Sequence, residues 1–303
     1  MPLSIFGFRA LWSPYFLLFV LLIIAAYFFL TVKKRHQFKN SEPLKASQAI
    51  LFVTAMILIY VVKGSPVDVM AHIMFTFHMV QMAFLYLVIP PIIIAGVPNW
   101  VWIQLLEISW IDKIFKFFTK PMIALVLFNG LFSVYHIPMV MDFVKMNIFL
   151  HAFYTIVLFI LGIFLWWPLI NKLPGQHQLH GLKKIGYILA DSVLLTPACG
   201  LIIFAPEAMY ATYTDGEMWM KAMELCVPGP TLAGLSISGP ELFTDMPARE
   251  DQQLGGVVMK IIQEIVLATV LAKVFFEWYR NEASDVDPVD ESLLQQHDPR
   301  PAE

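Results

Sequence analysis

The sequence predicts an all-α polytopic membrane protein with seven transmembrane helices, its N-terminus outside and its C-terminus in the cytoplasm. Of the 303 residues, 58% are hydrophobic and only 14% are charged, against about 25% charged residues in an ordinary soluble domain. The mean hydropathy is +0.69. The composition excludes a disordered chain, and the net charge of -3 offers no surface for nucleic acid. We therefore expect the lipid bilayer, and no nucleic acid, as a partner.

Seven runs of residues have the length and apolarity of membrane spans, which need about 20 apolar residues each. They are residues 12–32, 46–62, 69–97, 121–137, 148–169, 185–205 and 255–278. The last run contains four charged residues, among them Lys260 and Glu264. Its apolar residues still recur at helical spacing, so we interpret it as a span with a buried polar side.

The distribution of basic residues predicts the orientation of the spans. The connections at 33–45, 98–120 and 170–184 contain eleven Lys or Arg, against five on the opposite side. With seven spans, all three basic connections lie in the cytoplasm. The 206–251 loop is then extracytoplasmic. We expect a transmembrane domain over 1–280, and a disordered cytoplasmic tail over 281–303 because that segment has seven acids and one base.

Aromatic residues mark the expected membrane interfaces. Trp166 and Trp167 stand at a predicted span end, as in an aromatic belt. The 98–118 segment combines Trp100, Trp102 and Trp110 with polar residues, which predicts an amphipathic helix lying in the interface.

Ionisable groups inside a membrane are costly and are therefore candidate functional groups. Four of the eight histidines lie in or at the ends of spans, and the predicted orientation places all four in the outer half of the membrane. Most methionines map to the same side. Imidazole and thioether ligands together favour copper, especially Cu(I). The candidate metal ligands are His72, His78, His136, His151, Met74, Met82 and Met139.

Structural roles remain an alternative for these side chains, because methionines pack and histidines hydrogen-bond in membrane helices, and no tight ligand spacing is present. Cys226 is either a loop thiol or a metal ligand.

Other polar residues have mainly structural interpretations. Lys260 and Glu264, four apart, are expected to pair, Asp191 to form a structural hydrogen bond, and Asp251 to cap the last span. The residues assigned to structure or partner contact are Asp251, Gln252, Gln253, Lys260 and Glu264.

Several short motifs, in this order and spacing, resemble the Bacillus-type CtaG family of caa3 cytochrome c oxidase assembly factors. They are residues 78–82 (HMVQM), 89–91 (IPP), 135–138 (YHIP), 166–168 (WWP) and 251–259 (DQQLGGVVM). Within them, His78, His136 and, upstream of WWP, His151 match the family pattern. Many members have a histidine at the position of Met82 and a Glu-His pair at Tyr154 and Thr155, so a site built on those residues is incomplete here.

The resemblance implies a multi-pass protein of the plasma membrane that is not an enzyme. Its expected function is assembly of a caa3-type oxidase, through delivery or handling of Cu(I) on the outer side. The expected partners are oxidase subunits or their copper chaperones. Three alternatives stay open: a membrane haem-binding electron carrier, a copper transporter, and a retinal-type protein, which the lack of an acidic residue in the third span disfavours.

Overall fold

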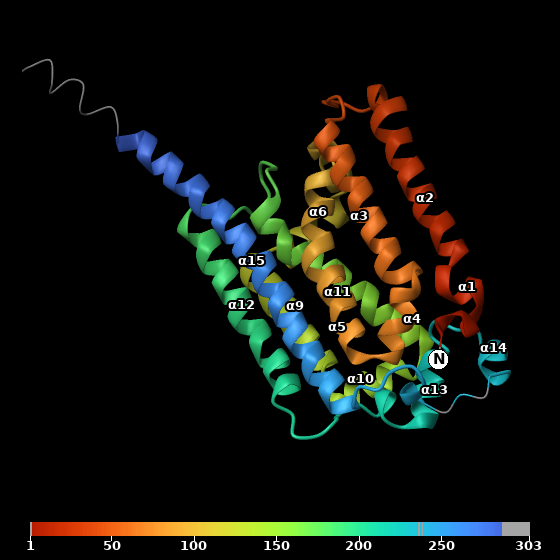
Figure 1. Ribbon diagram of the computed structural model, residues 1–303. Helices are drawn as coiled ribbons and strands as arrows, with labels where there is room; N and C mark the ends of the chain where they lie inside the picture. Colours follow the sequence, from red (N-terminus) through yellow and green to blue (C-terminus); the bar gives the residue numbers. More distant parts are fainter. Residues whose placement is uncertain (1, 236, 238, 287–303) are drawn as a thin grey trace, which may run out of the picture.

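The computed structural model describes residues 2–235, 237 and 239–286, and all regular elements in these residues are helical (Figure 1). The α-helices are α1 (Gly7–Trp12), α2 (Pro14–Phe28), α3 (Ala46–Gly64), α4 (Pro66–Ile73), α5 (Phe75–Ala83), α6 (Ile89–Gly96), α7 (Asn99–Leu106), α8 (Ser109–Phe118), α9 (Pro121–Tyr135), α10 (Pro138–Lys145), α11 (Ile148–Ile170), α12 (Leu182–Ile203), α13 (Gly216–Met223), α14 (Gly229–Ala233) and α15 (Ala248–Val286). Short 3-10 or π-helical segments include η2 (Phe29–Lys33), η4 (Phe84–Val88) and η5 (Ala211–Tyr213). The all-α prediction is confirmed.

Six helical stretches in the described residues are long and apolar enough to cross a membrane. They are Leu3–Lys33, Ala46–Gly64, Phe75–Gly96, Ile148–Ile170, Leu182–Ile203 and Ala248–Arg280. The pair α8 and α9, bent by 73°, makes a seventh if counted as one span. The 15 residues of α9 rise only about 22 Å, short of the roughly 30 Å hydrocarbon core.

The third span differs from its prediction at its beginning. We expected one helix from residue 69, but Met74 has an extended backbone that separates α4 from α5. The Ser65 hydroxyl accepts a hydrogen bond from the Val67 amide, and Pro66 occupies the first turn of α4. This combination favours a helix start. The short helix α4 is therefore a separate element before the span.

Two other predicted elements have different bounds. The 98–118 segment forms two helices, α7 and α8, instead of one. The last helix begins at Ala248 and continues to Val286, six residues into the segment expected to be disordered. Residues 287–303 of the predicted tail lie outside the described residues.

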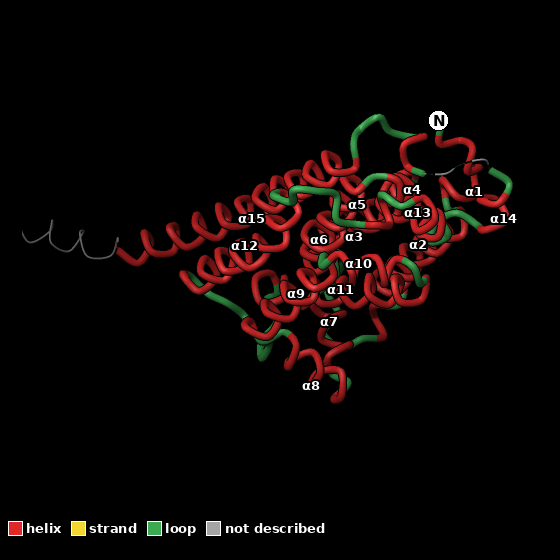
Figure 2. The backbone as a smooth tube through the Cα atoms, turned by 90° about the horizontal axis from the view of Figure 1, so that it is seen from below, coloured by secondary structure: helices red, strands yellow, loops and turns green. Residues whose placement is uncertain are grey.

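The bundle has two different ends (Figures 1 and 2). The short helices α4, α10, α13 and α14 gather at one of them, which we call the loop-rich end. At the other, the α8 end, the ring of Phe115 packs edge-on against Trp167 near the end of α11, with centroids 4.7 Å apart. Trp166 and Trp167 are both buried, at 1% and 0% exposure, so they belong to the core and not to a lipid-facing belt.

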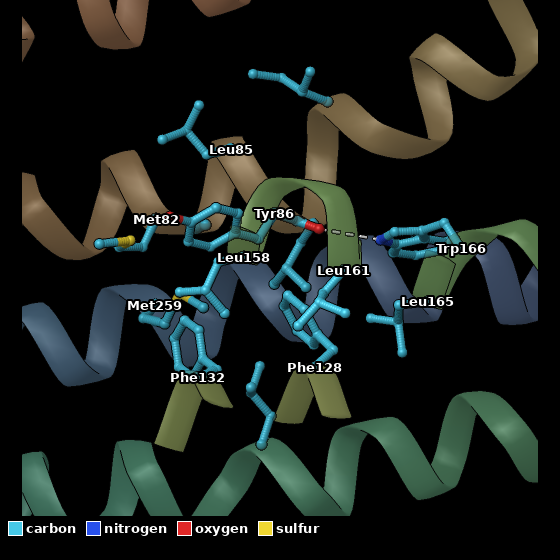
Figure 3. Close-up of a cluster of buried hydrophobic side chains, with 14 of the residues drawn as sticks. Met82, Leu85, Tyr86, Phe128, Phe132, Leu158, Leu161, Leu165, Trp166 and Met259 are labelled. Carbon is cyan, nitrogen blue, oxygen red and sulfur yellow. Dashed lines mark hydrogen bonds between the residues drawn. The ribbon is translucent and has the colours of Figure 1, made fainter. Parts of the chain in front are cut away.

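Aromatic and aliphatic side chains of η4, α9 and α11 form the centre of the core (Figure 3). Tyr86 lies between Phe132 and Trp166, whose indole Nε1 donates a hydrogen bond to the Tyr86 carbonyl at 3.3 Å. That carbonyl is available because Pro90 and Pro91, four and five residues later, have no N–H to donate to it. The core thus joins three spans at mid-height.

Close approach of α15 to its neighbours depends on two consecutive glycines. A Cβ on Gly255 would lie 2.8 Å from the Phe75 ring, and one on Gly256 would lie 2.8 Å from Ile203. Small residues permit this packing of membrane helices. The glycines therefore let α15 sit between α5 and α12 and fix the start of α5, where the candidate site begins.

Candidate functional site

The four span histidines come from four different elements and all lie at the loop-rich end. His72 belongs to α4, His78 to α5 and His151 to the first turn of α11, while His136 directly follows α9. Their rings form two pairs. The His78 and His136 centroids are 6.2 Å apart, and the His72 and His151 centroids are 5.9 Å apart. We call these four residues the histidine cluster.

Two backbone carbonyls determine how the imidazoles are protonated. Nδ1 of His136 lies 2.7 Å from the Phe132 oxygen, and Nδ1 of His72 lies 2.8 Å from the Asp68 oxygen. A carbonyl only accepts hydrogen bonds, so Nδ1 carries the proton and Nε2 of the neutral ring keeps a free lone pair.

The Nε2 atoms of His72, His78 and His136 are buried without a hydrogen-bond partner in the described residues. Such orphaned polar atoms need an explanation. A ligand histidine is typically oriented as His72 and His136 are, with one nitrogen bonded to a carbonyl and the other left for the metal. The donor set is therefore suited to a metal ion.

The separation within each pair also suits a shared ion. With nitrogen–metal distances of about 2.0–2.1 Å, two imidazoles on one ion have centroids about 5 to 6.4 Å apart. In the described residues, however, no group of three or more His, Cys, Asp or Glu could hold a metal ion. Each pair brings together two imidazole rings at a separation within this range.

The three candidate methionines do not share one environment. Met139 is 79% exposed on α10. Met74 packs against a small apolar cluster that contains Trp219 and Met223 of α13. Met82 points into the central core beside Phe132 and Met259 (Figure 3), and the Phe132 ring in turn contacts His136 at 4.3 Å. The structure brings the histidines together but not these three methionines.

A two-tyrosine lid covers the pair formed by His78 and His136. The ring of Tyr210 stacks on Phe75 at 4.7 Å, and its hydroxyl donates to the His136 carbonyl at 2.8 Å. Tyr213 lies 6.5 Å from His78, and its hydroxyl donates to the Ala71 carbonyl at 2.7 Å. We call residues 210–213 the lid.

One carboxylate of α10 anchors the lid. Asp142 accepts hydrogen bonds from the Ala211 and Thr212 amides, each at 3.0 Å, and from the Thr212 hydroxyl at 2.8 Å. A carboxylate that accepts several N–H and O–H donors holds a segment strongly. Asp142 therefore fixes η5 above the histidines.

A buried lysine adds a variable charge to the site. Lys145, also on α10, is 1% exposed and donates to the Tyr213 hydroxyl at 2.7 Å. Burial lowers the pKa of Lys145 to about 7, because desolvation disfavours the charged amine. Burial raises the pKa of Tyr213 well above its usual value, so its hydroxyl stays neutral.

A second polar group ties α4 to the spans on either side of it. Lys63 of α3 forms an ion pair with Asp68 at 2.6 Å, and the Gln81 amide donates to the same carboxylate oxygen at 2.8 Å. These contacts hold His72 and His78 in fixed register, since Asp68 and Gln81 lie on their two helices.

The Asp251-Gln252-Gln253 run connects the last helix to the site. We expected Asp251 to cap its own helix, but its carboxylate accepts the Phe75 and Thr76 amides at 2.5 and 3.1 Å and thus caps α5. The free amides of a helix start attract a carboxylate from any neighbouring element. Gln252 accepts from the Met209 amide at 2.7 Å, and Gln253 donates to the Ala205 carbonyl at 3.0 Å.

The polar residues deeper in the bundle bond to one another across helices. Lys260 and Glu264 form the expected ion pair at 2.7 Å, and they also bond to Thr196 and Ser192 of α12. The buried carboxylate of Asp191 accepts a hydrogen bond from the Asn129 amide at 2.8 Å, as predicted. These contacts bind α15 and α9 to α12.

Sequence reasoning missed the residues that enclose the cluster: Asp142, Lys145, Tyr210 and Tyr213. The one available signal was the spacing of Asp142 and Lys145, which places both on one face of α10. Nothing local connects them to tyrosines some 70 residues later. Among the described residues, the Cys226 thiol donates to the nearby Met223 carbonyl, at 3.5 Å.

The fold and site define a multi-pass membrane protein with a buried imidazole cluster at one end of its bundle. The chain belongs to the cytochrome c oxidase caa3 assembly factor family, whose profile matches residues 25–281. It is also similar to uncharacterized proteins of Mycobacterium bovis and Mycobacterium tuberculosis, each 24% identical over 259 residues, or 80% of this chain. The chain spans 35% of the length of these two relatives. No solved structure matches the chain.

Proposed function

We propose that the protein supports assembly of a caa3-type oxidase in the plasma membrane by binding Cu(I) at the histidine cluster and passing it to an oxidase subunit or its copper chaperone. Copper is cargo in this function, and the protein acts without catalysing a reaction. Family membership supports the assembly role. The single observation that carries the copper role is the pair of buried, unpartnered Nε2 atoms of His78 and His136 under the lid.

The predicted orientation gives the cluster a suitable place. Eleven basic residues in the connections on the opposite side predict that the loop-rich end faces outward. The lid, α10 and α13 would then lie between the cluster and the outer side of the membrane, where copper centres are loaded. Cu(I) suits this environment because it is a soft ion that accepts imidazole ligands at low coordination number.

Lys145 makes binding and release responsive to charge. A neutral amine beside the pairs leaves the lone pairs free for a cation, whereas a protonated amine repels it. Because its pKa lies at about 7, modest changes around the lid shift this balance.

The haem-carrier alternative has less structural support. Phe132, Tyr135 and Tyr213 have ring centroids within 6.5 Å of His78 or His136. These rings occupy space beside the pair, where a flat macrocycle between two axial imidazoles would need room. Haem binding would therefore require these three rings to move, whereas a single ion needs much less space.

The test is complementation of a deletion strain in copper-poor medium, with caa3 oxidase measured by its haem spectrum and its copper content. We expect His78→Ala and His136→Ala to insert at normal levels but to yield little copper-loaded oxidase. The matched control is His180→Ala, because His180 is an exposed histidine at the α8 end. Normal oxidase in the first two variants would contradict the proposal.

A further inference from the structure

Two adjoining cavities lie at the α8 end, opposite the histidine cluster. Their volumes are about 280 and 320 Å³. They share five lining residues from three places: the start of α3, the start of α7 and the turn after α11. The shared residues are Lys45, Gln48, Asn99, Lys172 and Leu173. The two cavities therefore adjoin each other between the ends of several helices, and we treat them as one site.

The cavities are lined by positive charge. Lys45 and Lys172 line both, and Lys273 of α15 lines the larger one. None of these three lysines forms an ion pair with a described residue. One carboxylate, that of Glu42, lines the smaller cavity. Unpaired lysines around a hollow at a membrane interface favour an anionic ligand.

A fourth lysine lies near two of the lysines that line the cavities. Lys184, at the start of α12, interacts repulsively with Lys172 and Lys273, and attractively with Glu277. Lys184 thus adds a fourth positive charge beside the cavities, and Glu277 adds an opposing negative one. Gathering like charges without a partner is unfavourable, and a bound anion would relieve the repulsion.

Buried indoles supply a second, independent observation. Trp100 lines the smaller cavity at 4% exposure, and Trp167 lines the larger one at 0% exposure. The Nε1 atoms of both are buried and have no acceptor among the described residues. A buried N–H without an acceptor costs free energy unless a ligand accepts its hydrogen bond.

An unpartnered indole alone does not define a site. Trp219 at the loop-rich end is also fully buried and unpartnered, but it lies in an apolar cluster with Met223 and Leu232. Trp100 and Trp167 differ because each lines a cavity that lysines also line. Trp219 is therefore a matched comparison for any experiment on the other two.

The N-terminal ends of two helices add N–H donors, whose partial charge is positive, as the charge of the lysines is. The cavities lie at the N-termini of α3 and α7, neither of which has an acidic residue in its first turn. Helix N-termini carry partial positive charge and free N–H groups. Apolar residues such as Ile94 and Ile170 line the larger cavity beside these donors, which suits a polar head attached to a less polar body.

We propose that this site at the α8 end binds a phosphate-bearing anion, held by Lys45, Lys172 and Lys273 and by the indole N–H groups of Trp100 and Trp167. The phosphate belongs either to the headgroup of an anionic phospholipid or to a free phosphate. The site is separate from the histidine cluster and does not depend on the proposed copper function.

The experiment uses the full chain purified in neutral detergent. Calorimetric titrations compare three probes: a short-chain phosphatidylglycerol, the matching phosphatidylcholine and inorganic phosphate. We expect phosphatidylglycerol, inorganic phosphate or both to bind, and phosphatidylcholine to bind much more weakly because it carries no net charge. Preference for phosphatidylglycerol over inorganic phosphate identifies a lipid headgroup, while equal or stronger phosphate binding identifies a soluble ligand.

Four variants test the site itself. Trp100→Phe and Trp167→Phe keep an aromatic ring and remove the N–H, so each should weaken binding about tenfold. The double variant Lys172→Gln and Lys273→Gln changes exposed side chains and should weaken it further, without a folding defect. Trp219→Phe should bind like the wild type. The proposal is overturned if neither anionic probe binds, or if binding is the same in wild type and lysine variant.

Discussion

Nδ1 of His136 lies 2.7 Å from the carbonyl oxygen of Phe132, one helical turn earlier. This contact places the imidazole proton on Nδ1 and leaves Nε2 as a buried lone pair without a partner. The ring of His78 lies 6.2 Å away. A helix end that terminates in this histidine therefore presents a metal-ligating atom in a dry environment.

The lid should loosen when its anchor is removed. Asp142→Ala leaves two backbone amides and one hydroxyl of residues 211–212 without their acceptor, which costs about 2 kcal/mol or more. We expect a lower Tm and faster amide exchange over residues 210–214. Asp215→Ala is the control, because Asp215 accepts one amide, that of Met218, at the exposed start of α13. Equal effects of the two variants would contradict the anchoring role.

Lys145 should make stability depend on pH. Its pKa is about 7 in the folded protein, below the ordinary 10.5, so between these values the unfolded chain binds more protons than the folded one. Stability due to this residue therefore rises from pH 7 to about pH 10. Lys145→Met removes the titrating group at similar size.

The corresponding measurement is the Tm of wild type and Lys145→Met across this range. We expect the wild type to gain stability relative to the variant as the pH rises from 7 to 10. Parallel curves would show that the amine stays charged in the folded protein, and that its burial is compensated in some other way.

Packing of α15 should tolerate no added Cβ at its contact with α5. Gly255→Ala introduces an atom 2.8 Å from the Phe75 ring and 3.2 Å from the Phe75 carbonyl. Overpacking of this kind costs about 1–3 kcal/mol. Gly130→Ala on α9 is the matched control, because a Cβ there meets nothing within 4 Å. Thermal unfolding should show a lower Tm for Gly255→Ala, and an unchanged or slightly raised Tm for Gly130→Ala. A higher Tm for Gly255→Ala would be inconsistent with this packing.

Hydropathy predicted most span positions because most of the apolar runs coincide with one long helical stretch. Hydropathy did not indicate the break at Met74, because the residues on both sides of the break are apolar. The signal for a new helix at Ser65-Pro66 was present in the sequence but lay beside a charged residue, Lys63, that already ended the previous span. The start of α4 is therefore set by Ser65 and Pro66 and not by the hydropathy of the segment.

The site was predictable in part. The predicted depth of the four histidines in the membrane placed them at one end of the bundle, because histidines at equivalent heights in antiparallel helices lie close together. Sequence spacing could not place Met82 or Met139, since the face a helix turns to its neighbours depends on packing. The α5 cap from Asp251 joins residues about 175 positions apart, so no local pattern could reveal it.

The most direct test of the central claim is a Cu(I) titration of the purified protein against a coloured Cu(I) chelator under anaerobic conditions. We predict that the wild type removes Cu(I) from the chelator, that His78→Ala and His136→Ala each weaken the affinity at least about tenfold, and that His180→Ala does not. Equal affinities in all four proteins, or no binding by the wild type, would contradict a copper site at the histidine cluster.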